Sequence, residues 1–213
     1  MPFPTESALV YVVDDDPALC RSLRFLLETE GWPVCLFDSA EAFLDALGTQ
    51  PAPSQPCCLL LDIRMPAMSG LELQQVLRNR GFDAPILFMT GHADVSMAVQ
   101  AMKCGACDFI EKPFNDQAVL DAVAGAVRRC ADMLDGAHRR DTARAALSHL
   151  SPREQEVAHL VARGQPNKLI AAELGISEKT VHIHRQHVME KAGVSSAAEL
   201  ARLFLRVDPG ALD

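Results

Sequence analysis

The sequence predicts an α/β domain built on a five-stranded parallel sheet, followed by an all-helical domain. In the first 134 residues, short apolar runs alternate with amphipathic stretches of helical period, which is the pattern of a parallel sheet covered by helices. From residue 148 onward, apolar residues recur at helical spacing only. A chain of 213 residues is long enough for one or two domains, and with 49% hydrophobic residues it can bury an ordinary core.

The first domain, placed at residues 7–130, is predicted to alternate five strands with five helices. The predicted strands are residues 9–13, 34–37, 57–62, 85–90 and 108–111. The predicted helices are residues 17–30, 39–47, 70–80, 95–103 and 115–134. Gly31, Gly81, Gly105, Pro113 and a proline-rich loop at 51–56 support the breaks, because glycine and proline interrupt regular elements. Residues 131–147 are polar, Arg/Ala-rich and free of proline, so we expect a partly helical linker.

The second domain, at residues 148–208, is predicted to contain four helices. Ser151, Pro152 and Glu154 form a strong helix start, with a cap, a proline at the first helical position and a capping-box glutamate. This helix should reach about residue 163. Helices at 167–174 and 177–192, joined by a turn at Gly175, have the lengths of a helix-turn-helix, and a fourth helix is expected at 196–206.

Charge is distributed unevenly along the chain. The formal net charge is -8, yet residues 1–135 carry 19 acidic and 9 basic groups, whereas residues 136–213 carry 9 acidic and 11 basic groups. An acidic domain joined to a domain that binds an anionic ligand would produce this asymmetry. An excess of two positive charges is nevertheless small compared with that of strongly basic DNA-binding domains.

The cysteines and the chain start argue for an intracellular protein. All seven cysteines lie in the first 130 residues, mostly within predicted strands or helices. We therefore favour the interpretation that they serve as small apolar side chains of the core. Cys104 and Cys107 form a C-x-x-C, but no second pair accompanies it, which leaves zinc or redox use as the minor alternative. No apolar stretch approaches ~20 residues, and the N-terminus lacks the features of a signal peptide. We therefore expect a cytoplasmic protein without a membrane partner.

Polar residues stand where four of the apolar runs end: Asp14, Asp15, Asp62, Thr90 and Lys112. In open parallel sheets, ligands bind at the carboxyl ends of the strands, so we expect these side chains to share one pocket. Three carboxylates repel one another unless a cation lies between them, and hard oxygen ligands favour Mg²⁺. With a lysine and a threonine hydroxyl added, the set matches the needs of phosphoryl transfer, and Asp62 is the natural acceptor.

Each of these residues has an ordinary explanation by itself. An Asp-Asp pair before Pro17 can be a helix cap, and Asp62 can be a loop acid. Joint placement at four strand ends makes coincidence improbable. A nucleotide-binding sheet is the structural rival, but the first strand is followed by three aspartates and contains no G-x-G-x-x-G.

Several motifs in residues 7–130 resemble the receiver domains of two-component response regulators, and their forms are most similar to the FixJ subfamily. They are Val13-Asp-Asp15, Leu61-Asp-Ile-Arg-Met-Pro66, Met68-Ser-Gly70, Met89-Thr-Gly-His92 and Asp108-Phe-Ile-Glu-Lys-Pro-Phe114. The resemblance implies a flavodoxin-like (βα)5 fold in which a sensor histidine kinase phosphorylates Asp62. It also implies that Asp14, Asp15, Asp62 and the backbone carbonyl of Arg64 hold Mg²⁺.

The same resemblance assigns the readout of phosphorylation. Thr90 and Lys112 match the residues that contact the phosphoryl group, and Phe109 matches an aromatic switch. By periodicity alone, Phe109 is simply a core aromatic of a strand. The Lys112-Pro113 bond is often cis in this family, which would aim the lysine inward.

Residues 146–207 resemble the LuxR-type DNA-binding domain over three motifs. They are Leu150-Ser-Pro-Arg-Glu-Gln-Glu-Val157, Gly164-Gln-Pro-Asn-Lys-Leu-Ile-Ala171 and Leu174-Gly-Ile-Ser-Glu-Lys-Thr-Val-His-Ile-His-Arg185. Pro166 departs from the usual serine or threonine. The positions that match base readers are His182, Ile183 and Gln186. Those that match phosphate or scaffold contacts are Asn167, Lys168, Lys179, Thr180 and Arg185. The alternative is that the four helices bind a protein instead of DNA.

The resulting hypothesis is a response regulator and not an enzyme. Phosphorylation of Asp62 would promote homodimerisation through a face made by residues 95–103 and 108–111, followed by promoter binding and contact with RNA polymerase, and activation is favoured over repression. One alternative is a phosphorylation-independent DNA-binding protein with a vestigial receiver. Another is a Mg²⁺-dependent phosphatase with an aspartyl nucleophile, but such enzymes resemble D-x-D-x-T whereas this chain has Asp62-Ile-Arg-Met-Pro.

Overall fold

The computed structural model describes residues 8–49, 53–91 and 101–212. The chain divides into two compact units, Met1–Leu134 and Asp135–Asp213. Within the described ranges, none of the helices combines the length and the apolar character needed to cross a membrane.

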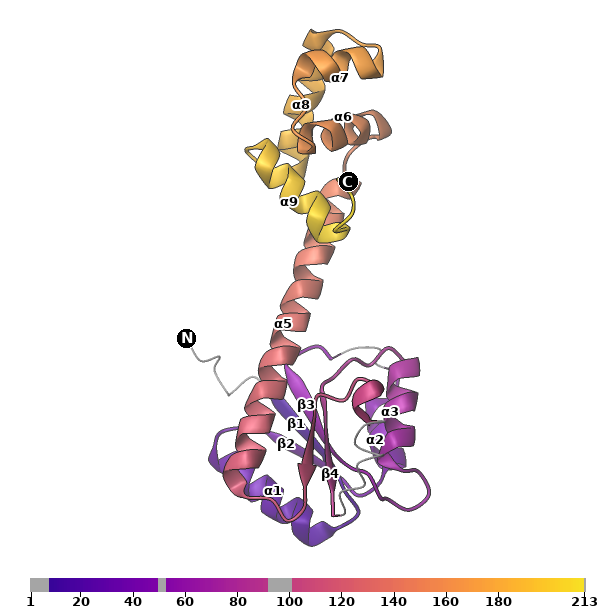
Figure 1. The fold of residues 1–213 in the computed structure, drawn as a ribbon, viewed down its shortest axis with the longest axis vertical. Coiled ribbons are helices and arrows are strands. Elements are labelled where there is room, and N and C mark those ends of the chain that lie inside the picture. Colours follow the sequence, from indigo (N-terminus) through magenta and orange to yellow (C-terminus); the bar gives the residue numbers. More distant parts are fainter. Residues whose placement is uncertain (1–7, 50–52, 92–100, 213) are drawn as a thin grey trace. The chain divides into compact units, whose positions relative to one another are not determined.

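The first unit contains one sheet of parallel strands in the order β2-β1-β3-β4-β5 (Figure 1). The strands are β1 (Leu9–Val13), β2 (Val34–Phe37), β3 (Cys57–Asp62), β4 (Ile86–Thr90) and β5 (Asp108–Glu111). Every residue of β3 and β4 is buried, which is why these two runs are continuously apolar instead of alternating. This strand order is that of flavodoxin-like sheets, so the predicted fold class is confirmed.

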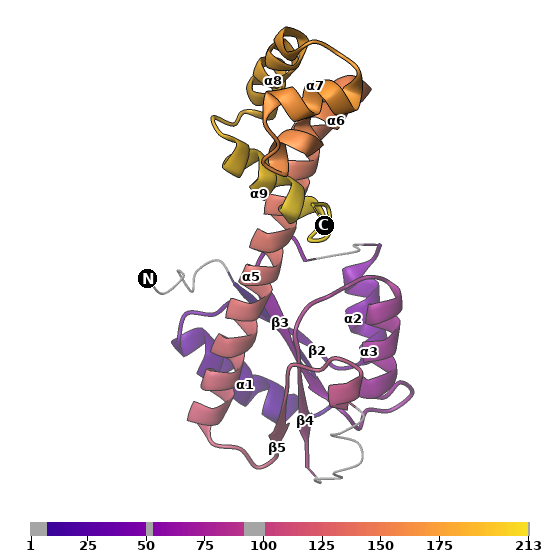
Figure 2. The ribbon, with the colours of Figure 1, turned by 45° about the horizontal axis from the view of Figure 1, so that its top comes forward.

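Helices cover both faces of this sheet. They are α1 (Pro17–Thr29), α2 (Ala40–Leu47), α3 (Gly70–Asn79) and α5 (Asp116–Ser148). Figures 1 and 2 both show α1 and α5 on one face of the sheet and α2 and α3 on the other. One core accordingly contains Phe43, Leu73 and Phe88, and the opposite core contains Leu23 and Val123.

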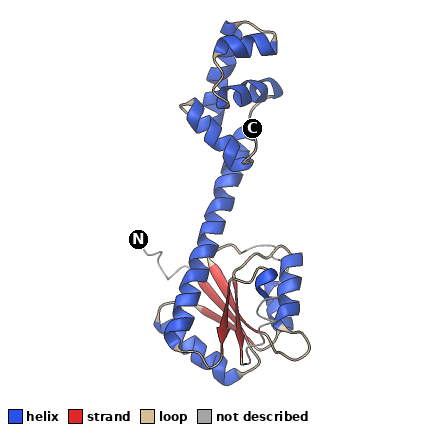
Figure 3. Ribbon diagram, in the orientation of Figure 1, coloured by secondary structure: helices blue, strands red, loops and turns tan. Residues whose placement is uncertain are grey.

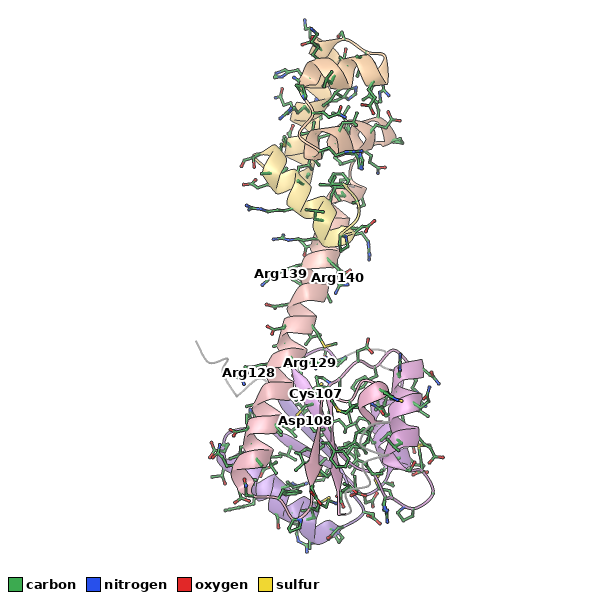
Figure 4. All side chains as sticks on the ribbon, viewed as in Figure 1. Cys107, Asp108, Arg128, Arg129, Arg139 and Arg140 are labelled. Atoms are coloured by element: carbon green, nitrogen blue, oxygen red, sulfur yellow. The ribbon has the colours of Figure 1, made fainter. Side chains whose placement is uncertain are left out.

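Two predicted elements need comment. Of the helix expected at 95–103, residues 95–100 lie outside the described part of the chain, and residues 101–103 are helical. The linker expected at 131–147 is helical throughout, because α5 continues to Ser148. Good helix formers, the absence of proline and an ion pair between Asp135 and Arg139 at 3.3 Å support this continuation, and Figure 4 shows Arg139 and Arg140 projecting from it.

Over its described residues, the second unit consists of helices joined by short loops and contains no strand (Figure 3). After the end of α5 come α6 (Pro152–Ala162), α7 (Asn167–Leu174), α8 (Glu178–Ala192) and α9 (Ala197–Val207). Ser151, Ser177 and Ser196 cap three of the helices, each accepting a hydrogen bond from a backbone N–H of the first turn. Gly175 ends α7 in the left-handed conformation, with φ of +66°. The shared core contains Val157, Ile170, Val181 and Leu200.

Candidate functional site

The polar residues predicted to share a pocket lie at the carboxyl ends of the strands. Asp14 follows β1, Asp62 and Thr90 are the last residues of β3 and β4, and Lys112 follows β5. Because all five strands are parallel, these ends meet at one edge of the sheet.

Lys112 bridges two buried carboxylates at this edge. Its Nζ lies 2.6 Å from Asp14 Oδ2 and 2.7 Å from Asp62 Oδ1. Asp14 is 1% exposed and Asp62 is 6% exposed. Burial lowers the pKa of Lys112, but its hydrogen bonds to the two aspartates outweigh burial and raise that pKa overall. The ammonium group is therefore held in its charged form between two acids.

The pKa of Asp62 is set by two opposing effects. Burial raises the pKa of its carboxyl, Lys112 opposes this effect, and the net result is a raised pKa. Its second oxygen, Oδ2, accepts a hydrogen bond from the backbone N–H of Arg64 at 2.7 Å. The Asp62 carboxylate thus has one oxygen on a cation and one on a backbone donor, which fixes the orientation of the carboxylate.

The loop after β3 packs tightly against Asp62. The backbone N–H of Gly70 donates to the carbonyl of Ile63 at 3.0 Å. A Cβ atom at position 70 would lie only 2.2 Å from the backbone oxygen of Asp62. Glycine is therefore required at the start of α3, because the neighbouring atom belongs to the backbone of the site and cannot move aside cheaply.

The remaining predicted residues of this site differ in exposure. Asp15 is exposed and, with Asp14, lines a hollow of about 540 Å³. Thr90 is buried, and its carbonyl accepts a hydrogen bond from the Lys112 N–H at 2.7 Å. The Lys112-Pro113 bond is cis. Phe109 is half-buried against the core that contains Phe88, its partner in the register of β4 and β5.

The carboxylates suit an oxygen-preferring divalent cation. Asp14 and Asp62 already converge on a single cationic nitrogen, so their oxygens can also converge on a metal ion. Across the described ranges, no three Asp, Glu, His or Cys side chains are grouped closely enough to hold a metal by themselves. Mg²⁺ does not need such a cage, because it retains waters and usually takes one or two carboxylates together with a phosphate oxygen. The residues present fit that mode of binding.

In the second unit, α8 presents a donor-rich surface. Lys179, His182, Ile183 and Gln186 are exposed, and the Ile183 side chain is 44% exposed although it is apolar. Lys168 of α7 is also exposed. These side chains are available to a ligand on the face of the helix-turn-helix.

Three other predicted contact residues of this unit already have partners within it. Arg185 Nη1 donates to Asn167 Oδ1 at 3.1 Å, which connects α8 to the first residue of α7. The Thr180 and Ser177 hydroxyls lie 2.8 Å apart at the start of α8. These residues therefore orient the helices of the helix-turn-helix, and only part of each side chain is free for another ligand.

Two residues of α6 also orient the helix-turn-helix, through contacts with α7 and α8 that their local motif did not predict. Glu154 is buried and accepts hydrogen bonds from Lys191 Nζ of α8 at 2.7 and 2.9 Å. Arg153 Nη2 donates to the carbonyl of Leu174, the last residue of α7, at 2.6 Å. The hydrogen bonds from Lys191 and the Ser151 backbone lower the pKa of Glu154 to about 2.

Family models cover most of both units. A response regulator receiver domain matches residues 10–124, and the luxR family of bacterial regulatory proteins matches residues 148–204. The chain belongs to the response regulators.

Relatives of this response regulator resemble it over nearly its whole length. The transcriptional regulatory protein FixJ of Azorhizobium caulinodans is 44% identical, over 94% of this chain and 93% of FixJ. FixJ of Bradyrhizobium diazoefficiens is 43% identical, over 95% of this chain and 97% of its own. Among solved structures, that of the response regulator StyR has 43% identity and a TM-score of 0.81, covering 92% of this chain and 98% of StyR.

The family establishes the general role of the chain. This response regulator is a two-component transcription regulator that joins a receiver to a LuxR-type DNA-binding domain. A receiver implies a sensor kinase as partner, and a LuxR-type domain implies DNA as ligand.

Proposed function

We propose that a sensor histidine kinase phosphorylates Asp62, and that the phosphorylated regulator dimerises and binds promoter DNA in a sequence-specific manner. The observation that carries this proposal is the bridge from Lys112 to the buried Asp14 and Asp62 at 2.6 and 2.7 Å. Two acids and one base leave a net negative charge in a buried site, which favours a cation there and a transferable anionic group next to that cation.

In this proposal the residues at the strand ends bind the metal, attack the phosphoryl group or pair with its charge. Asp14, Asp15, Asp62 and the backbone carbonyl of Arg64 would hold Mg²⁺, which when bound neutralises the charge of the transferred phosphoryl group. Asp62 Oδ1, which now faces Lys112 Nζ, supplies the attacking oxygen. Lys112 then pairs with a phosphoryl oxygen, because a phosphoryl group adds roughly -1.5 to -2 charge and three strong acceptors.

The readout would pass through Thr90 and Phe109. Thr90 contacts the phosphoryl group through its hydroxyl, and the half-buried Phe109 packs further inward. The face proposed to form the dimer contains β5 and the helix expected at 95–103. Of the apolar residues on that helix, Met97 and Val99 lie outside the described ranges, Ala101 is buried in the core, and Met102 is 48% exposed.

Dimerisation would place two copies of α8 on DNA half-sites about one helical turn, ~34 Å, apart. His182, Ile183 and Gln186 are the proposed base readers, since glutamine can pair with adenine and isoleucine can contact a thymine methyl group. Lys168 and Lys179 are proposed phosphate contacts, with Asn167, Thr180 and Arg185 as further backbone contacts or scaffold. Recruitment of RNA polymerase, and hence activation, would follow from binding at a promoter.

The deciding experiment compares the full chain with the Asp62→Asn variant, each with Mg²⁺ and with or without acetyl phosphate. Sedimentation should show a dimer only for the wild type with the phosphodonor, and a fluorescence anisotropy titration should show tighter binding to promoter DNA in the same sample. Equal dimerisation and equal DNA affinity of the two proteins would overturn the proposal and favour a vestigial receiver. Asp45→Asn, which removes an exposed acid from α2, is the matched control and should behave as the wild type.

A further inference from the structure

A further hollow of the receiver unit lies at the opposite end of the sheet from Asp62. Its lining includes Ile86, the first residue of β4, and Cys107, which precedes β5. Thr90 and Lys112 lie at the carboxyl ends of these two strands. We call this space, of about 300 Å³, the amino-end hollow. Among the described residues that line it, none belongs to the phosphorylation site.

The buried part of the lining of the amino-end hollow is apolar, and the exposed part is mainly cationic. The buried apolar side chains are Leu77, Phe82, Ala84 and Ile86. The exposed charged side chains are the bases Arg78, Lys103 and Arg129 and the acid Asp83. Residues 1–135 carry 19 acidic and 9 basic groups, so this local excess of bases reverses the average charge of the domain. A local excess of positive charge attracts anions.

The three cations come from separate elements and are available to a ligand. Arg78 lies in α3, Lys103 in the helical segment 101–103 and Arg129 in α5. Within the part of the chain that the structure describes, none of them forms an ion pair. Arg129 Nη1 lies 4.0 Å from the sulfur of Cys107, so its guanidinium group reaches from α5 to the start of β5 (Figure 4). Long basic side chains placed in this way can meet on one anion.

Gln74 holds two walls of the hollow together. This residue of α3 is 4% exposed. Its Nε2 donates hydrogen bonds to the carbonyl of Ala101 at 3.4 Å and to the carbonyl of Cys104 at 3.3 Å. These bonds join α3 to the segment that carries Lys103. The hollow is therefore formed by the fold itself, as most small-molecule sites are.

We propose that the amino-end hollow binds a small apolar carboxylate. Its volume is about ten times the ~30 Å³ that a water molecule occupies in the liquid, so it has room for roughly ten non-hydrogen atoms. A hydrocarbon ring would cover Leu77, Phe82 and the 43% exposed Met133 and would release water from them. The carboxylate would accept hydrogen bonds from Lys103 or Arg129. An inorganic anion would satisfy the cations but leave the apolar lining in water.

Two thiols of the lining can report whether the hollow is occupied. Cys104 and Cys107 are free and half-buried. In the full chain, iodoacetamide alkylation followed by peptide mass spectrometry gives the reaction rate of each cysteine. Cyclohexanecarboxylate should slow both thiols with a Kd of about 1 mM, and the uncharged cyclohexanecarboxamide should bind about tenfold more weakly. Cys35, half-buried in β2 and outside the hollow, should react at an unchanged rate.

Variants test the role of the cations. Lys103→Gln and Arg129→Gln should each raise the Kd of the carboxylate about fivefold or more, when each rate is compared with that of the same variant without ligand. Both side chains are exposed, and an unchanged Cys35 rate checks that each variant is folded. Arg128→Gln is the matched control, because Arg128 is the exposed neighbour of Arg129 in α5 and does not line the hollow (Figure 4).

Four results would overturn the proposal. The first is equal protection by the carboxamide, and the second is protection by inorganic phosphate at a lower concentration than by the carboxylate. The third is an equal slowing of Cys35, which would show that the probe acts on the whole protein. The fourth is unprotected Cys104 and Cys107 at about 20 mM carboxylate, well above the expected Kd.

Discussion

Lys112 Nζ lies 2.7 Å from Asp62 Oδ1, so the predicted acceptor carboxylate and the only cation within hydrogen-bonding distance of it among the described residues form a buried pair. Asp14 shares the same ammonium group, which leaves two acids to one base. The site therefore carries one excess negative charge when both acids are ionised. The free energy of unfolding of the receiver unit should then depend on whether Asp62 is ionised.

We expect Asp62→Asn to stabilise the receiver unit at neutral pH. Burial raises the pKa of Asp62 despite Lys112, so its ionised form is disfavoured in the folded state. With a raised folded-state pKa, the contribution of Asp62 is most favourable below its ordinary value near 3.8 and is lost as the pH rises through the raised value. An amide does not ionise, and Lys112 keeps Asp14. Urea unfolding followed by the fluorescence of Trp32, the only tryptophan, should show a variant more stable than wild type at pH 7.5.

The difference should shrink as the pH is lowered toward 4. Asp45→Asn, at an exposed position of α2, should match the wild type at each pH. A lower stability of Asp62→Asn at pH 7.5 would show that the hydrogen bond to Lys112 outweighs the cost of the buried charge, contrary to this expectation.

Gly70→Ala should damage both the fold and the site. Its Cβ would meet the Asp62 backbone oxygen at 2.2 Å, and overpacking of this kind typically costs about 1–3 kcal/mol. We expect Trp32 fluorescence to report that loss in urea unfolding, and the rate of phosphorylation by acetyl phosphate to fall as well. Gly125→Ala is the matched control, because no atom lies within 4 Å of its new Cβ in α5 and alanine there should add about 0.5–1 kcal/mol of stability. Wild-type phosphorylation in a stable Gly70→Ala protein would contradict the steric argument.

The sequence was sufficient for the sheet and for the edge at which its polar residues gather. Apolar runs such as Cys57–Asp62 are strong signals because a strand buried on both faces leaves no polar position until it ends. The shared pocket of Lys112 and Asp62 was predicted from their strand ends, but the second bond of Lys112, to Asp14, depends on side-chain reach, which has no sequence pattern.

Contacts between distant elements of the second unit were not predictable in the same way. Glu154 looked like a capping-box residue, and it is one, yet its carboxylate also holds Lys191, which is 37 positions away. Similarly, Arg185 and Asn167 were expected to be phosphate or scaffold contacts, but their spacing in the sequence did not predict that they would pair with each other. Local spacing identifies a helix and its cap, but only tertiary packing decides which polar side chains remain free.

The Glu154–Lys191 pair should make the second unit sensitive to acid. The lowered pKa of Glu154, about 2 against an ordinary value of 4.5, means that its contribution is present above pH 4.5 and is lost as the pH falls toward 2. In the full chain, the methyl NMR signals of Val157 and Leu200 should report loss of this core over that range. Glu154→Gln should flatten the dependence, whereas Glu173→Gln, at an exposed position of α7, should not. An unchanged acid transition in Glu154→Gln would remove the pair as its cause.

Substitutions on α8 should separate base reading from orientation of the helix. Gln186→Ala and Ile183→Ala remove exposed side chains, so each should cost about 1–3 kcal/mol on the promoter site and little on random DNA. Lys179→Ala should weaken binding to both DNAs and reduce its salt dependence by about one counterion. Arg185→Ala releases Asn167 and loosens α7 from α8, so it should lower promoter affinity and also the protection of α7 amides in hydrogen exchange without DNA. If Arg185→Ala weakens DNA binding while the amide protection of α7 is unchanged, Arg185 contacts DNA directly and does not act through Asn167.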